Sequence, residues 1–331
     1  MSEPVRTWGP AADPDGIVVT GLARSFGPVA AVRDASFTAR AGQVTALIGP
    51  NGSGKTTLLL MLATLLRPHA GSIRIQGHDP VASPAAVRAV MGWMPDLLGA
   101  WPSLTVRSTL VITGRLYRMD RQRAAARADE LITLVGLSEL ADRPNRVLSR
   151  GQKQRLSLAR ALVHDPGVLL LDEPASGLDP AARIELRLLL RRLADEGRTV
   201  LVSSHVLAEL DELADTAVYL DAGVTASAES ISRTQRSRRE WRLRILDAAD
   251  PAAALQSAGI LAEHIRVDHL GTVVAVRGDT DAADLLQRLV AAGLPVVSFA
   301  PAVGDLEHTF LDLNRPDLNR PERNDPDRGP E

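Results

Sequence analysis

The sequence predicts an α/β protein in which a mostly parallel sheet carries an inserted helical subdomain and is followed by a small α+β domain. Three short apolar runs, 44–48, 167–171 and 199–203, are typical of buried parallel strands. Between residues 97 and 164 the strand signals stop, and leucines recur at helical spacing instead. After Gly223 shorter strand and helix patterns alternate, which indicates a second domain.

Length and composition limit the class of protein. The chain has 331 residues, which suggests two domains, and its net charge of -2 gives no overall drive toward nucleic acid or anionic membrane. It has no cysteine, which excludes disulfide scaffolds, thiol nucleophiles and cysteine-based metal sites. No run reaches the roughly 18 consecutive apolar residues of a spanning helix, and the first 15 residues do not resemble a signal peptide. We therefore expect a protein kept on the cytoplasmic side, whose membrane role would come through a partner.

The first domain is expected to cover residues 17–229, after a flexible leader at 1–16. Its helical subdomain should span about 97–164. The other expected elements of the first domain are strands at 17–20, 30–38, 44–48, 167–171 and 199–203 and a buried helix at 58–66.

The second domain is expected to cover residues 240–313, after a polar, arginine-rich linker at 230–239. Its elements follow the order βαββαβ, which is that of a ferredoxin-like unit, with one more helix at the end. Residues 314–331 are rich in proline, asparagine and charge and should form a disordered tail. The expected strands are 241–246, 265–268, 272–277 and 295–299, and the expected helices are 251–258, 282–292 and 306–313.

Residues 49–56 read Gly-Pro-Asn-Gly-Ser-Gly-Lys-Thr, the phosphate-loop pattern, and they join a predicted strand to a predicted helix as that pattern requires. Glycines let backbone N–H groups curl around phosphates, and the helix N-terminus adds positive potential. Lys55 would supply a charge to the β- and γ-phosphates, and the Thr56 hydroxyl would ligate Mg²⁺. The ATP-binding residues predicted here are Gly49, Pro50, Asn51, Gly52, Ser53, Gly54, Lys55, Thr56 and Thr57.

Two acids, Asp172 and Glu173, follow the apolar strand at 167–171. At the carboxyl edge of a parallel sheet Asp172 would lie beside the phosphate loop and hold the metal. Glu173 would orient and deprotonate an attacking water. A strand merely capped by acids is the alternative, and the phosphate loop favours the metal and catalytic roles.

Residues 148–161, which begin Leu-Ser-Arg-Gly-Gln, lie between the phosphate loop and the acidic strand. Ser149 is a predicted helix N-cap and Gly151 a position of close approach. This run resembles the signature motif of ATP-binding cassette (ABC) proteins, and the resemblance, with all motifs in order, covers about 17–224 and implies a P-loop NTPase cassette fold. In that family the motif, here Ser149, Arg150, Gly151 and Gln152, contacts the nucleotide held by the opposite subunit. Arg150 stands where the commonest version has glycine.

The resemblance implies roles for three more residues. Asp179 belongs to a run, Ser-Gly-Leu-Asp-Pro, that resembles the D-loop at the dimer interface. His205 matches the switch histidine that would bond the γ-phosphate, although a lone histidine at a strand end is more often structural. Phe26 stands where the family has its adenine-stacking aromatic residue, and a phenylalanine of the core is the alternative.

Asp96 departs from the family pattern, because a glutamine usually ends the strand before the helical subdomain. A carboxylate would still ligate Mg²⁺, directly or through water. It is shorter than glutamine, donates no hydrogen bond when ionised and adds negative charge beside the phosphates. Asp96 therefore changes the loop that couples the nucleotide state to the transmembrane partner in this family.

The resemblance implies an ATPase, with ATP and Mg²⁺ as cofactors, that powers a separate membrane permease from the cytoplasmic face of the membrane. Two copies, as a homodimer or in a heterodimer, would hold two ATP–Mg²⁺ between them. Residues 104–106, 203–210 and 304–313 are similar to ATP-binding subunits of bacterial exporters. Export of a drug, antibiotic, lipid or polysaccharide is therefore the leading expectation.

Three other functions stay open. A ferredoxin-like C-terminal domain also occurs on amino-acid importer ATPases, where it senses substrate. A soluble cassette ATPase acting on nucleic acid or ribosomes usually has a second cassette or a coiled-coil insert, which this sequence lacks, so we expect no nucleic-acid partner. The basic run around Trp241 could contact nucleic acid or anionic lipid. Its Arg242 and Arg244 alternate with apolar residues, as on an exposed strand, which favours a solvated linker that leads into a strand. A regulatory module without turnover is disfavoured by the intact Lys55, Asp172, Glu173 and His205.

Overall fold

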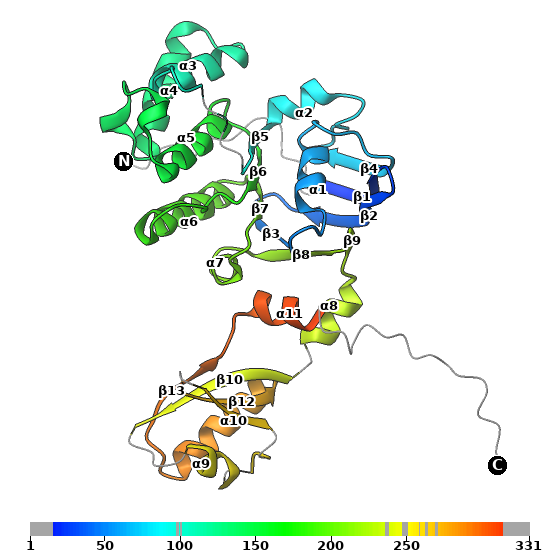
Figure 1. The fold of residues 1–331 in the computed structure, drawn as a ribbon, viewed down its shortest axis with the longest axis vertical. Coiled ribbons are helices and arrows are strands. Elements are labelled where there is room, and N and C mark those ends of the chain that lie inside the picture. Colours follow the sequence, from blue (N-terminus) through cyan, green and yellow to red (C-terminus); the bar gives the residue numbers. More distant parts are fainter. Residues whose placement is uncertain are drawn as a thin grey trace, which may run out of the picture. The chain divides into compact units, whose positions relative to one another are not determined.

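The computed structural model describes residues 16–96, 99, 101–235, 238–246, 251–257, 259–261, 264–268 and 271–313. The expected leader, except Gly16, and the expected tail at 314–331 lie outside these residues. The chain divides into two compact units, Met1–Thr225 and Ala226–Glu331 (Figure 1). No helix in the described part is long and apolar enough to cross a membrane.

The first unit is built on a nine-stranded sheet. Its strands are β1 (Ile17–Phe26), β2 (Val29–Ala39), β3 (Val44–Ile48), β4 (Ala70–Ile75), β5 (Met91–Met94), β6 (Val168–Asp172), β7 (Thr199–Ser203), β8 (Thr216–Asp221) and β9 (Val224–Thr225). The sheet order is β4-β1-β2-β9-β8-β3-β7-β6-β5, and the last five strands in this order are parallel. The sequence prediction of a mostly parallel α/β core is confirmed.

The parallel strands β3, β6 and β7 are buried at every residue. Helix α1 (Lys55–Leu62) packs on one side of the sheet and α6 (Pro180–Asp195) on the other (Figure 1). With both faces covered, a strand has no solvent face, and its sequence is apolar throughout instead of alternating. This is why these strands could be recognised from the sequence.

Strand β1 is longer than the expected strand at 17–20 and pairs antiparallel with both β2 and β4. The expectation ended at Gly21, since glycine usually interrupts a strand. Gly21 instead takes φ +56° inside the shift in the β1–β2 register that falls between Val19 and Leu22, so the strand bulges and continues.

The named elements within the described residues of 97–164 are all helices. They are α3 (Val106–Leu116), α4 (Arg121–Leu134), α5 (Arg150–Leu162) and the short 3₁₀ helices η1 (Ser138–Leu140) and η2 (Asn145–Val147). The inserted helical subdomain was therefore predicted correctly. The remaining helices of the first unit are α2 (Pro84–Val90) and α7 (Leu207–Asp211).

The second unit contains a four-stranded antiparallel sheet of order β11-β12-β10-β13. Its elements are α8 (Ala228–Gln235), β10 (Arg238–Ile245), α9 (Pro251–Ser257), β11 (Ile265–Asp268), β12 (Gly271–Arg277), α10 (Gly278–Ala291), β13 (Val296–Pro301) and α11 (Asp305–Leu313). From β10 to β13 the order is βαββαβ, so this is the ferredoxin-like arrangement that the sequence predicted.

The described residues of the expected linker, 230–235 and 238–239, have regular structure instead. Most of them belong to α8, which packs against α11, and the last two begin β10. Arg239 pairs with Asp305 and donates to the carbonyl oxygen of Val303 at 2.7 Å. These partners are more than 60 residues away in the chain. The sequence around Arg239 therefore shows a charged residue but not the residues that pair with it.

Candidate active site

Most of the predicted site residues meet at the carboxyl ends of β3, β5, β6 and β7, around a cavity of about 860 Å³. This is within the size range of small-molecule sites. The cavity is lined by Val29, Ala30, Ala31, Asn51, Gly52, Gly54, Lys55, Thr56, Thr57, Leu60, Trp93, Pro95, Asp96, Arg150, Asp172, Glu173, Ser176 and His205. The predicted residues that do not line it are Phe26, Gly49, Pro50, Ser53, Ser149, Gly151, Gln152 and Asp179.

The phosphate loop turns from β3 into α1 with a backbone that only glycine fits. Gly54 is the N-cap of α1 at φ +105°, and a Cβ there would lie 2.3 Å from the carbonyl oxygen of Ala31. A Cβ on Gly49 would lie 2.2 Å from the carbonyl oxygen of Leu220. The N–H groups of the first turn of α1 have no partner within the helix, so this end of the cavity favours an anion.

Lys55 lies across the phosphate loop. Its ammonium group donates to the carbonyl oxygens of Gly49 at 2.6 Å and Pro50 at 3.1 Å. Burial lowers the pKa of Lys55, and the carboxylates of Glu173 and Asp172 act in the opposite direction. The lysine is therefore a half-buried cation between the loop and the two acids.

Asp172 is nearly buried at the end of β6 and accepts a hydrogen bond of 2.6 Å from the Ser203 hydroxyl. Burial raises the pKa of Asp172; the bond from Ser203 opposes that shift, the charge of Asp96 adds to it, and Lys55 opposes it. Asp96 and Asp172 thus repel each other across one cavity.

Thr56, Asp96 and Asp172 all line this cavity, and side-chain oxygens are the ligands that suit Mg²⁺, a hard cation. The described residues contain no cluster of three or more His, Cys, Asp or Glu able to hold a metal. One or two carboxylates completed by phosphate oxygens is the usual donor set for Mg²⁺ with a nucleotide. The donors present therefore fit a Mg²⁺ shared with a bound nucleotide.

Glu173 is held in a backbone conformation that is sparse for a residue with a side chain, at φ +51°. Its N–H donates to the carbonyl and hydroxyl oxygens of Ser203 at 3.2 and 3.1 Å, and its carbonyl oxygen accepts from Gln154 at 2.7 Å. Its Oε2 lies 2.7 Å from Nδ1 of the exposed His205. Burial raises the pKa of Glu173, and His205 opposes that shift.

Sequence reasoning missed Ser203 and Gln154 as supports of the two acids. Ser203 had a partial signal, because it ends the apolar run at 199–203 much as Asp172 follows the run at 167–171. That the two strands pair with Asp172 opposite Ser203 is seen only in the structure. Gln154 is 2 % exposed on the buried side of α5, and a polar residue in such a position needs a partner.

Ser149 caps α5 as predicted, in a reciprocal pair with Gln152. The Gln152 N–H donates to the Ser149 hydroxyl at 3.2 Å, and the Ser149 N–H donates to Oε1 of Gln152 at 2.9 Å. Gly151 is a position of close approach, since a Cβ there would lie 3.0 Å from the carbonyl oxygen of Gly177.

Arg150 donates to the Ser176 hydroxyl at 2.8 Å, and its side chain lies against Gly177. It therefore contacts the segment predicted as the D-loop in its own chain. Asp179, from the same segment, caps α6 by accepting from the N–H of Ala182 at 2.9 Å. That bond lowers the pKa of Asp179.

Phe26 ends β1 and is 47 % exposed, so it is not a residue of the core. The guanidinium of Arg24 lies 5.0 Å from the centre of its ring. Its partner across the β1–β2 hairpin is Val29, which lines the cavity. Phe26 is thus next to the cavity with a ring face already covered by a cation.

Comparison with known proteins agrees with this geometry. The sequence family described as "ABC transporter" matches residues 32–176. The daunorubicin/doxorubicin resistance ATP-binding protein DrrA of Streptomyces peucetius is 36% identical over 303 residues, 90% of this chain and 92% of that protein. A Nod factor export ATP-binding protein I of Burkholderia orbicola is 34% identical over 291 residues, 88% of this chain and 94% of that protein.

Among solved structures, one titled "Structure of ATP binding subunit of ABC transporter" is 26% identical and superimposes with a TM-score of 0.60. It covers 66% of this chain and 92% of that one. The match to DrrA is longer, and at 303 residues it includes most of the second unit. With its phosphate loop, paired acids and signature helix, the chain therefore belongs to the ATP-binding cassette ATPases of ABC transporters.

Proposed function

We propose that this ATPase powers export of an organic molecule, such as a drug, antibiotic, lipid or polysaccharide, through a separate membrane permease. The observation that carries the proposal is the length of the match to proteins named for drug resistance and Nod factor export, about nine-tenths of this chain. The similarity thus includes the second unit as well as the cassette. The names of these relatives favour export over the amino-acid importer that the sequence left open.

In the proposed mechanism the phosphate loop holds the β- and γ-phosphates, and Lys55 leaves its carbonyl partners to neutralise them. Thr56, Asp172 and Asp96 would hold Mg²⁺, which would neutralise charge on the phosphate oxygens. Glu173 takes the proton of the attacking water at its carboxylate as the water oxygen bonds to the γ-phosphorus and the bond from that phosphorus to the leaving ADP oxygen breaks. An ionised carboxylate can only accept, so Nδ1 of His205 donates in that pair, and Nε2 donates to the γ-phosphate when it too carries a proton.

We further propose that two copies close around two nucleotides, each signature motif facing the phosphate loop of the other copy. Ser149, Gly151 and Gln152 line no part of the chain's own cavity, which supports their use by a partner's nucleotide. Because one chain carries both halves of such a site, a homodimer is sufficient. The permease would then hold this ATPase at the cytoplasmic face of the membrane.

Recovery of the partner tests the export proposal. Tagged Glu173→Gln protein, added with ATP to membranes of the source cell, should retain a polytopic membrane protein that lacks a cassette of its own. Lys55→Ala protein serves as the control and should retain much less of it, because the nucleotide-bound dimer would not form. Proteomics that found only ribosomal or DNA-bound proteins would contradict the proposal and favour the nucleic-acid alternative.

Asp96→Gln, which restores the residue usual in the family, should raise the Mg²⁺ concentration for half-maximal ATPase activity by about tenfold, as loss of a metal-supporting group does. The rate at saturating Mg²⁺ should change much less, because Glu173 and Lys55 are untouched. A Mg²⁺ titration of steady-state phosphate release measures both quantities. The matched control is Glu139→Gln, an exposed acid outside the cavity. If the Mg²⁺ requirement did not change, Asp96 would not be a ligand of the metal.

A further inference from the structure

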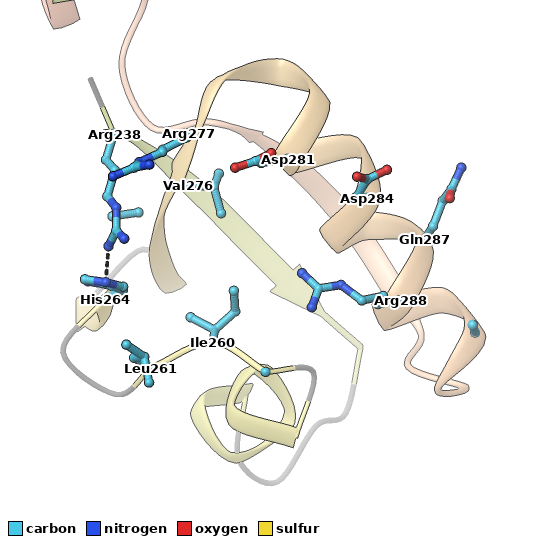
Figure 2. A pocket seen from close by; sticks show the side chains of 13 residues that line it. Arg238, Ile260, Leu261, His264, Val276, Arg277, Asp281, Asp284, Gln287 and Arg288 are labelled. Atoms are coloured by element: carbon cyan, nitrogen blue, oxygen red, sulfur yellow. Dashed lines mark hydrogen bonds between the residues drawn. The ribbon is translucent and has the colours of Figure 1, made fainter. Parts of the chain in front are cut away.

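The second unit has a cavity of its own, of about 840 Å³. It lies between α10, the end of β12 and the segment that precedes β11 (Figure 2). All its lining residues belong to the second unit, so it is distinct from the nucleotide cavity. Its size is within the range of sites for small molecules.

One wall of this cavity is apolar. Ile260, Leu261 and Val276 line it, and Leu261 is 61 % exposed. Val276 also belongs to the core of the unit, against which Ile260 packs. The wall is therefore anchored to the core and leaves apolar surface for a ligand to cover.

Three arginines from three places in the fold line the same cavity: Arg238 of β10, Arg277 at the end of β12, and Arg288 of α10. In Figure 2, Arg238 and Arg277 lie together at one end, and Arg288 points from α10 toward the segment of Ile260. Nη1 of Arg288 comes close to Gly259, where a Cβ would lie 3.4 Å from it. These guanidinium groups are not spread along one solvated face but converge on one volume.

Two of the three arginines, Arg238 and Arg277, form no ion pair with a carboxylate among the described residues. Arg238 is hydrogen-bonded to Nε2 of His264, and since arginine cannot accept, the guanidinium is the donor. In the described part of the chain, the Arg277 side chain makes no hydrogen bond or ion pair, although its backbone pairs with Arg238 in the sheet. A guanidinium of this kind is suited to a carboxylate, sulfonate or phosphate.

Two acids on α10, Asp281 and Asp284, line the cavity as well. They share one side of the helix with Arg288, at spacings of three and four residues. Three arginines therefore face two aspartates, a balance that favours one negative charge on a ligand and disfavours a polyanion such as a nucleotide.

We propose that this cavity binds a small amphipathic monoanion, with its acidic group on the arginines and its apolar body on Ile260, Leu261 and Val276. The proposal goes beyond the ATPase and does not depend on it, because no residue is shared between the two cavities.

Octanoate and its uncharged analogue octanol test the proposal by isothermal titration calorimetry on the full-length protein. Octanoate should bind saturably at millimolar concentration or below, and octanol at least about tenfold more weakly, the worth of a charged hydrogen bond. Equal affinity for the two, or no saturable binding of octanoate, would overturn the proposal.

Arg277→Gln should weaken octanoate binding by about tenfold, because it removes one charged contact. Arg244→Gln is the matched control, since Arg244 is exposed on β10 and lies outside the cavity. Arg288→Gln gives a second reading if the first variant is unstable. An equal loss of affinity in the control and in both cavity variants would show a general charge effect and refute the site.

Discussion

Replacing Glu173 with glutamine should lower the ATPase rate by at least about a hundredfold while ATP still binds, the usual scale for loss of a general base. Glutamine keeps the size of the side chain and a hydrogen bond to His205 but cannot take a proton from water. The backbone of Glu173 is fixed by Ser203 and Gln154, neither of which contacts its carboxylate. The substitution should therefore remove chemistry without moving the loop.

Steady-state phosphate release and equilibrium ATP binding measure the two halves of this prediction. The trapped ATP complex should also run as a dimer in size-exclusion chromatography, since the nucleotides that hold the copies together persist. Glu139→Gln, an exposed acid outside the cavity, should retain the native rate. If Glu173→Gln also hydrolysed at the native rate, another group would have to be the base.

The pH dependence gives a second reading of the same assignment. Burial raises the pKa of Glu173, and the base works only when ionised. As the pH falls, the ionised fraction is lost through this raised pKa, so kcat/KM should decline at a higher pH than an exposed glutamate would give. The residual activity of Glu173→Gln should lack this decline.

The parts of the fold and site that were predictable are those whose cause is local. A fully buried strand such as β6 has to be apolar at every position, and the phosphate loop needs glycine at Gly54 because a side chain would meet Ala31. Each constraint therefore produces a pattern in a short stretch of the sequence. The order of the motifs along the chain then placed them at one edge of the sheet.

The parts that were missed depend on contacts between distant segments. Ser203 reaches Asp172 because β6 and β7 pair in one register, and Gln154 reaches Glu173 across 19 residues. The positive φ of Glu173 could not be predicted, because glutamate is not a residue type that usually adopts it. The cavity of the second unit is assembled from separate segments that carry no motif.

Lys55→Ala should weaken ATP binding by at least about a hundredfold and abolish turnover, because charged bonds to two phosphates are lost together. The cavity would also keep Asp96, Asp172 and Glu173, and the last two would lose the charge of Lys55, which lowers their pKa. Its carboxylates would then repel a triphosphate, so the effect should exceed the loss of the lysine contacts alone. Binding of a fluorescent ATP analogue with Mg²⁺ measures it.

Lys55→Arg should not restore activity, although it keeps the charge. The ammonium is a compact donor that fits between the carbonyl oxygens of Gly49 and Pro50, whereas a guanidinium is planar and larger. Chemical labelling tests the same contact in the wild-type protein, because Lys55 and Lys153 are the only lysines of the sequence. ATP with Mg²⁺ should protect Lys55 from an amine-reactive reagent, with Lys153 as the internal control, and mass spectrometry of the labelled peptides measures both. If ATP did not reduce the labelling of Lys55, its ammonium group would not contact the phosphates. The explanation given above for the loss of ATP affinity in Lys55→Ala would then be wrong.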